Sequence, residues 1–196
     1  MRWFKWLTGK KRHRRILFPI REKIAEYIPD NSEVIDIGSG TGSLLFLLAD
    51  RIKQGTGIDS DSSMIKFCKR KAQKQNIKNL DFKLLDANQL NSKEYDIATS
   101  ALTIHSLDSN YQMSILRKMA SISDKVIIAD IIEPESIFTK LYLCFDEILA
   151  GHYTNYKKYI RNGGMPYLIN QANLSIEKHA KTSSKLIDIW VCRSNS

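Results

Sequence analysis

The sequence has 196 residues, enough for one sizeable hydrophobic core and too few for two domains of ordinary size. Hydrophobic residues make up 43% and charged residues 26%, which excludes an extensively disordered chain and is typical of a soluble globular protein. The formal net charge of +9 comes largely from residues 1–21, which carry eight basic side chains and no acidic one, so the basicity belongs to an N-terminal arm.

The first two thirds of the chain alternate short apolar strands with helices. Pro19 suits the first turn of a helix in which Ile20, Ile24 and Ile28 recur at a spacing of four. Five strands are then predicted at Glu33–Ile37, Gly55–Asp59, Leu80–Leu85, Tyr95–Ala101 and Lys125–Ile131. Helices are predicted between them at Ser43–Ile52, at Ser62–Gln75 after an N-cap at Asp61 or Ser62, and from Asp108 or Ser109 to Ala120. This alternation predicts an α/β fold of Rossmann-like, doubly wound type with a mostly parallel sheet.

The pattern changes after residue 132. Glu135–Ala150 is predicted to be helical, and a second helical stretch over Tyr153–Asn170 is interrupted by Gly163 and Gly164. Leu174–His179 and Leu186–Cys192 are predicted as a C-terminal antiparallel hairpin. We therefore expect a basic arm over residues 1–18 and a single domain over 19–196. Within that domain we expect residues 133–173 to form a substrate lid rich in ring side chains, namely Tyr142, Phe145, His152, Tyr153, Tyr156, Tyr159 and Tyr167.

A glycine-rich turn, Gly38-Ser39-Gly40-Thr41-Gly42, follows the first predicted strand. A strand that enters such a turn and leaves as a helix brings a ligand close to bare backbone and to free N–H groups. A dinucleotide site requires Gly-x-Gly-x-x-Gly, but the third glycine position is occupied by Ser43, and the third glycine falls at Gly42. This spacing, with no separate catalytic domain, disfavours a nicotinamide-dependent oxidoreductase.

The run from Asp36 to Gly42 resembles the first motif of class I S-adenosylmethionine-dependent methyltransferases. Gly57-Ile58-Asp59 is similar to the second motif of that family, Leu84–Ala87 to the third, and Tyr95–Leu102 to its fourth strand, while the closing hairpin also fits. The resemblance covers about residues 30–193 and implies S-adenosyl-L-methionine as cofactor. It implies cofactor contacts at Asp36, Gly38, Ser39, Gly40, Gly42, Asp59, Ser60, Asp86, Ala87 and Ser100.

The predicted carboxylates have physical roles as well as ordinary alternatives. Asp59 can accept both hydrogen bonds from a ribose diol, and the resemblance gives Asp86 the adenine amino group. As alternatives, Asp36 bonds only the backbone of the turn, and Asp59 and Asp86 are ordinary residues at strand ends.

His105 is the candidate general base, because it lies just past the fourth predicted strand, where open α/β sheets place their ligands. It also resembles the histidine that many small-molecule and quinone-type members of the family carry there. The alternative is that His105 caps a helix or bonds backbone, and Asp130 is a weaker candidate for the base.

The sequence has no motif typical of methylation of amino groups on bases and none typical of cytosine-C5 chemistry. It also has no set of carboxylates that marks a magnesium-dependent catechol site, so we expect no metal. Cys68, Cys144 and Cys192 form no Cys-x-x-Cys pair, and we expect reduced thiols.

The acceptor that these features favour is a small molecule or a lipid-like compound. The alternative is an RNA methyltransferase that uses the basic arm as a phosphate tether, and a non-catalytic module that kept the cofactor site is a third interpretation. The oligomeric state is not predicted.

The arm combines Trp3, Phe4, Trp6 and Leu7 with the basic run Lys10–Arg15. Such aromatic residues partition into lipid headgroups, and the cations attract an anionic surface. No apolar run reaches the roughly 20 residues that a membrane span needs, and no secretory signal is visible. We therefore expect a cytoplasmic protein with a peripheral contact of residues 1–15 to the inner membrane face, and nucleic acid is the less favoured partner.

Overall fold

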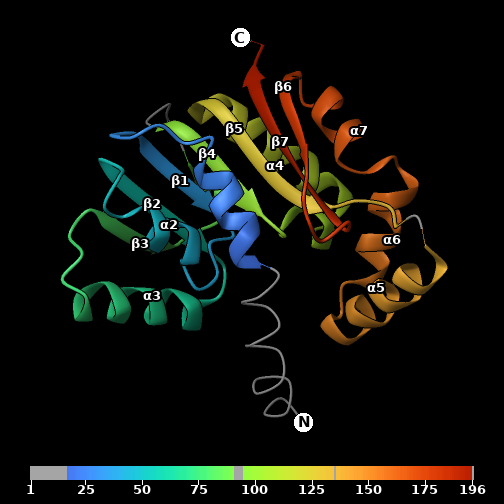
Figure 1. Ribbon diagram of the computed structural model, residues 1–196, viewed down its shortest axis with the longest axis horizontal. Coiled ribbons are helices and arrows are strands. Elements are labelled where there is room, and N and C mark those ends of the chain that lie inside the picture. Colours follow the sequence, from blue (N-terminus) through green and yellow to red (C-terminus); the bar gives the residue numbers. More distant parts are fainter. Residues whose placement is uncertain (1–16, 91–94, 135, 196) are drawn as a thin grey trace.

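A seven-stranded mixed sheet forms the centre of the computed structural model, which describes residues 17–90, 95–134 and 136–195 (Figure 1). The spatial order of the strands is β3-β2-β1-β4-β5-β7-β6. The strands are β1 (Glu33–Ile37), β2 (Gln54–Asp59), β3 (Leu80–Leu84), β4 (Tyr95–Ala101), β5 (Ser123–Ile131), β6 (Leu174–Lys181) and β7 (Ile187–Ser194).

The first five strands are parallel, and the C-terminal hairpin is antiparallel to them. β1 pairs with both β2 and β4 in parallel register, and β4 pairs with β5 in the same way. β7 runs antiparallel to β5, with Ile128 opposite Trp190, and β6 closes the edge beyond it. The carboxyl ends of β1 to β5 therefore meet at one edge of the sheet, which we call the carboxyl edge.

Helices cover both faces of the sheet, because inward-pointing apolar residues alternate along its central strands. On one face, Val34 and Ile127 join a core with the first helix (residues 17–25), α2 (Ser43–Leu48) and α3 (Ser62–Lys74). On the other face, Ile35 and Ile128 join a core with α4 (Ser109–Ile122) and α7 (Gly164–Gln171). Figure 1 looks onto the first of these faces, with α4 behind the sheet.

The remaining helical elements lie at the carboxyl edge. Two short 3₁₀ helices, η1 (Ala87–Gln89) and η2 (Ile104–Ser106), follow β3 and β4. α5 (Ile137–Ala150) and α6 (Tyr153–Arg161) follow β5 and extend past the ends of the central strands (Figure 1). A third apolar cluster of Ile131, Leu143 and Tyr156 lies between β5, α5 and α6.

The predicted fold class and the C-terminal hairpin are confirmed. Two boundaries differ: α2 ends at Leu48, four residues before the predicted end, and the first helix already includes Leu17 and Phe18, which we had assigned to the arm. The rest of the arm, residues 1–16, lies outside the described residues. Among the helices that the structure describes, none has both the length and the apolar character that crossing a bilayer requires.

Candidate cofactor and acceptor site

The glycine-rich turn lies at the carboxyl end of β1 and leaves one open backbone surface. Gly40 and Gly42 have φ values of 51° and 66°, in the left-handed region that favours glycine. A Cβ at Gly42 would lie 2.7 Å from the Phe82 ring, whereas a Cβ at Gly40 would meet nothing within 4 Å. The backbone at Gly40 is therefore exposed to an approaching ligand.

Asp59, the last residue of β2, connects this turn to the next one. Its Oδ2 accepts a hydrogen bond from the Gly40 N–H at 2.8 Å, and its Oδ1 accepts one from the Asp61 N–H at 2.8 Å. Each carboxylate oxygen can accept a second bond, so capacity remains for a diol. The neighbouring Ser60 is exposed.

Ser39 carries a hydroxyl oxygen that is buried and has no hydrogen-bond partner among the described residues. A buried polar group without a partner is costly. A polar ligand group that reaches the turn would supply the missing partner.

Asp36 and Ser100 lie beneath the turn and are buried. The Thr99 hydroxyl donates to Asp36 Oδ1 at 2.8 Å, and the Ser100 hydroxyl donates to the Ile37 carbonyl at 3.1 Å. Burial raises the pKa of Asp36 to about 7, although the Thr99 bond and the nearby Arg21 charge act in the opposite direction. These contacts join β1 to β4, and the cofactor contact of both residues stays a prediction.

Asp86 and Ala87 follow β3 on the other side of β2. Asp86 Oδ1 accepts a hydrogen bond from the Asn88 N–H at 2.8 Å and caps η1, where Ala87 is buried. Burial and a hydrogen bond to Asp86 raise the pKa of Tyr111 to about 12. The carboxylate of Asp86 is exposed and retains acceptor capacity for an amino group.

The residues present therefore fit an adenosine-containing cofactor. The open surface at Gly40, the unpartnered Ser39 hydroxyl, and the Asp59 and Asp86 carboxylates all lie along the carboxyl ends of β1, β2 and β3. S-adenosylmethionine, when bound there, supplies an electrophilic methyl group on a positively charged sulfur.

His105 lies in η2, just past β4, and forms a buried charged cluster with Asp130 and Glu147. His105 is 6% exposed, Asp130 is 0% exposed and Glu147 is 6% exposed. His105 Nδ1 contacts Asp130 Oδ1, and the His105 backbone N–H donates to Asp130 Oδ2 at 3.2 Å. His105 Nε2 lies 3.5 Å from Glu147 Oε1 on α5.

The carboxylates determine the protonation of the ring. Burial alone would lower the pKa of His105, but Asp130 and Glu147 outweigh it and raise that pKa to about 10. A general base needs an unprotonated nitrogen, whereas this arrangement stabilises the imidazolium. The base role of His105 stays a prediction that the described geometry does not favour.

Two functional candidates were missed in the sequence. Glu147 lies 42 positions after His105 in a lid helix, and nothing local indicates that it is buried. Arg21 was counted with the basic arm, but it lies in the first helix near Asp36, and burial lowers its pKa.

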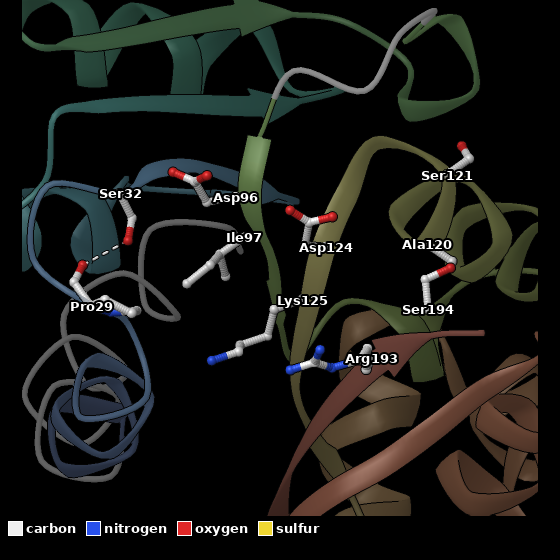
Figure 2. Close-up of a pocket in the computed structure, with 10 residues that line it drawn as sticks. All are labelled: Pro29, Ser32, Asp96, Ile97, Ala120, Ser121, Asp124, Lys125, Arg193 and Ser194. Atoms are coloured by element: carbon white, nitrogen blue, oxygen red, sulfur yellow. Dashed lines mark hydrogen bonds between the residues drawn. The ribbon is translucent and has the colours of Figure 1, made fainter. Parts of the chain in front are cut away.

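A pocket of about 630 Å³ lies at the opposite edge of the sheet (Figure 2). Asp96, Asp124 and Lys125 line it at the starts of β4 and β5, and Arg193 lines it at the end of β7. None of the predicted site residues lines this pocket. Ligands of open α/β sheets bind at the carboxyl ends of the strands, so this pocket is not the candidate site.

Comparison with solved structures defines the class of the fold. A S-adenosylmethionine-dependent methyltransferase from Aquifex aeolicus is 15% identical, with a TM-score of 0.65 over 91% of this chain and 92% of that chain. Magnesium protoporphyrin IX methyltransferase from Synechocystis PCC 6803, solved with bound S-adenosylhomocysteine, is 18% identical, with a TM-score of 0.68 over 93% of this chain and 84% of that chain. These likenesses show the Rossmann-like methyltransferase fold.

Sequence comparison identifies the family. The methyltransferase domain model matches residues 28–186, so the chain belongs to that family, and we class it with the S-adenosylmethionine-dependent methyltransferases. A curated relative is protein 235L of Invertebrate iridescent virus 6, whose methyltransferase assignment is itself provisional. It is 42% identical over 76 residues, which are 37% of this chain and 27% of the relative. The match thus spans about a quarter of that relative.

Proposed function

We propose that the protein transfers the methyl group of S-adenosylmethionine to a small-molecule or lipid-like acceptor bound between the carboxyl edge and helices α5 and α6. The observation that carries this proposal is the acidic character of the carboxyl edge. Asp36, Asp59 and Asp86 lie at or just past the ends of β1, β2 and β3, and Asp130 lies near the end of β5.

This charge disfavours the RNA alternative. An RNA acceptor would bring phosphates to the site, and binding of phosphates depends on lysine and arginine side chains. The carboxylates of Asp59 and Asp86 would repel them, as would the negative charge that the cluster of Asp130, Glu147 and the His105 imidazolium carries in excess. A neutral or cationic small acceptor meets no such repulsion.

The apolar cluster beneath α5 and α6 supports an acceptor with an apolar body. Leu143 and Tyr156 are buried there against Ile131, and Leu102 packs beside them. Residues 133–173, the predicted lid, contribute two of these side chains. The named substrate of one similar structure, magnesium protoporphyrin IX, is also a small molecule, which supports the same class of acceptor.

The outer surface of α5 supports a lipid-like acceptor. Ile137, Leu141 and Ile148 are 69%, 64% and 57% exposed, and their spacing of four and seven residues places them on one stripe of the helix. In Figure 1, α5 lies at the lower right, and the first helix begins at its own lower end, in front of the sheet. In the sequence, the basic and aromatic arm directly precedes that helix. An anionic membrane surface would match both features.

The proposal is tested by incubating the purified protein with methyl-labelled S-adenosylmethionine and separate metabolite, lipid and RNA fractions. We expect labelled product in the metabolite or lipid fraction and none in RNA. Binding of S-adenosylhomocysteine is measured by calorimetry on the same preparation. Label in RNA alone would overturn the acceptor class, and failure to bind S-adenosylhomocysteine would overturn the cofactor assignment.

A further inference from the structure

One carboxylate oxygen of Glu147 is buried beneath the lid without a hydrogen-bond partner among the described residues. The residue is 6% exposed, its Oε1 lies 3.5 Å from His105 Nε2, and its Oε2 is buried with no hydrogen-bond partner among the described residues. An unpartnered carboxylate oxygen in a buried position is costly. A hydrogen-bond donor is therefore missing at this point.

The other members of the cluster cannot supply that donor. Asp130 Oδ1 contacts His105 Nδ1 and accepts from the Ile131 N–H at 2.8 Å, and its Oδ2 accepts from the His105 N–H. Both ring nitrogens of His105 already face carboxylates. The cluster holds two carboxylates against one imidazolium, so it has acceptor capacity and negative charge in excess.

The cluster also lies next to the cofactor turn and next to apolar surface. Thr103, two residues before His105, packs so closely on the turn that a Cβ at Gly38 would lie 2.4 Å from its hydroxyl oxygen. On the lid side, Leu143 and Tyr156 belong to the same buried cluster as Ile131. The cluster thus lies between the segment that packs on the cofactor turn and a buried apolar group of the lid.

We propose that Glu147 is the acceptor-binding and proton-accepting residue of the site, and that the acceptor is an apolar molecule carrying a hydroxyl or amine group that donates to Glu147 Oε2. This inference rests on the proposed function. It assigns to Glu147, on the lid, the role that the sequence predicted for His105.

The chemical step balances with these residues. The oxygen or nitrogen of the acceptor forms a bond to the methyl carbon as the bond between that carbon and the sulfur breaks. The proton of the acceptor passes to Glu147 Oε2, the carboxylate becomes a neutral acid, and the sulfur becomes a neutral thioether. His105 and Asp130 are positioning residues, since His105 holds Glu147 Oε1 and Asp130 holds the ring.

The test uses phenol and anisole as probes, because they share a ring and only phenol has a proton donor. Binding to the full chain is measured by calorimetry, with and without S-adenosylhomocysteine, and in the proteins that keep His105 the ¹⁵N signals of its ring show whether the probe reaches the cluster. We expect phenol to bind at least about tenfold more tightly than anisole, as the gain from one charged hydrogen bond implies. The Glu147→Gln variant should lose about five- to tenfold in phenol affinity, and Glu147→Ala should bind both probes equally.

Glu133→Gln is the matched control, because Glu133 is exposed and its carboxylate lies 3.4 Å from Lys140 Nζ, outside the cluster of His105, Asp130 and Glu147. It should bind phenol like the parent. His105→Gln should weaken phenol binding as much as Glu147→Gln does. The double variant should lose no more phenol affinity than either single variant, because the two residues act as a unit. A merely structural role of His105 would not produce this result.

Equal affinity of the parent for phenol and anisole, no binding of phenol, or unchanged binding by Glu147→Gln would each overturn the assignment. Should Glu147→Ala fail to fold, the Glu147→Gln comparison still decides. A protein that binds S-adenosylhomocysteine but shows no preference for phenol refutes the inference alone. A protein that does not bind S-adenosylhomocysteine refutes the proposed function instead.

Discussion

At the scale of single residues, the cofactor contact predicted for Asp59 has the clearest physical basis. Its two oxygens already accept backbone bonds from the turns after β1 and β2, so the carboxylate is held at one position beside Gly40. A carboxylate that is fixed before the ligand arrives loses little conformational entropy on binding. The structure thus gives a physical reason for the role that the motif predicted.

Asp59→Asn should weaken binding of S-adenosylhomocysteine by about ten- to a hundredfold, since a charged hydrogen bond contributes about 1.5–3 kcal/mol. Calorimetry measures the loss, and thermal unfolding reports whether the turn survives. Asp50→Asn, at an exposed position after α2, is the control and should bind like the parent. Parental affinity in Asp59→Asn would show that the ribose is not placed at this carboxylate.

Asp36 should make the stability of the protein depend on pH in an unusual direction. Its pKa is about 7 in the fold because of burial, against 3.8 as the ordinary value. Between these values the unfolded chain has lost the proton and the native protein keeps it, so the free energy of unfolding falls as pH rises from about 4 to 7. The contribution is on the order of 4 kcal/mol, at about 1.4 kcal/mol per pH unit.

Urea unfolding of the parent and of Asp36→Asn at several pH values measures this effect. The difference in stability between the two proteins should shift in favour of the variant across that range and become constant above about pH 8, where both states have lost the proton. A constant difference at all pH values would show that Asp36 titrates normally.

The positions of single residues could be predicted where the signal is local. Asp59 and Asp86 were expected at the ends of strands, and each does follow from a strand into a turn, whereas their contact with the cofactor stays a prediction. Glu147 could not be predicted, because its burial depends on how α5 packs against η2, a contact between segments 42 residues apart. For His105 the position could be predicted, but its protonation depends on that same contact.

At the scale of elements, the glycine turn separates two roles that glycine can have. Gly42 is needed for packing, because a Cβ would overlap Phe82, whereas Gly40 leaves open space. Gly42→Ala should therefore lower the free energy of unfolding by about 2–4 kcal/mol, from backbone strain and overpacking together.

Gly40→Ala should cost only about 1–2 kcal/mol of stability, from its left-handed backbone. It should nevertheless weaken S-adenosylhomocysteine binding at least about tenfold, because the methyl group fills the surface that the ligand approaches. Denaturant unfolding and calorimetry on both variants give the comparison. Intact binding in Gly40→Ala would place the cofactor away from the turn.

The elements themselves could be predicted because most of them are bounded by local signals. The break between α6 and α7 coincides with Gly163 and Gly164, as expected from the sequence, and both have positive φ values. α2 ends early, and residues 49–52 form a turn in which Arg51 donates to Asp30 and to the carbonyls of Ala25 and Ile28, ahead of β1. That ending depends on contacts distant in sequence, which periodicity does not report.

At the scale of the whole molecule, charge is divided between two regions of the chain. The carboxyl edge gathers acidic side chains from four strands, whereas the basic residues of the N-terminal arm precede the first helix. Composition alone revealed the basic arm. The acidic edge is visible only once the parallel strands are aligned, because its carboxylates are separated by long stretches of sequence.

The arm and the outer stripe of α5 should act together on an anionic membrane surface. Deletion of residues 2–15 removes seven of the basic residues together with Trp3, Phe4, Trp6 and Leu7. With about 1 kcal/mol of attraction per basic residue near the surface, the deletion should reduce co-sedimentation with phosphatidylserine-containing vesicles by at least about tenfold. Parental binding should also weaken at high salt.

Replacing Ile137, Leu141 and Ile148 together by serine should reduce vesicle binding while keeping the salt dependence, because apolar contact and not charge is lost. Ile176→Ser, at an exposed position on β6, is the matched control and should bind like the parent. The deletion and the triple serine variant should both still bind S-adenosylhomocysteine. The deletion leaves intact the described fold, which begins at residue 17, and keeps Ile20 and Ile24 in the core. The three serines replace side chains that are exposed.

A filter assay with RNA is run beside the vesicle assay. Retention of RNA without binding to vesicles would favour the RNA alternative, and binding to neither would show that the arm is a solvated tail.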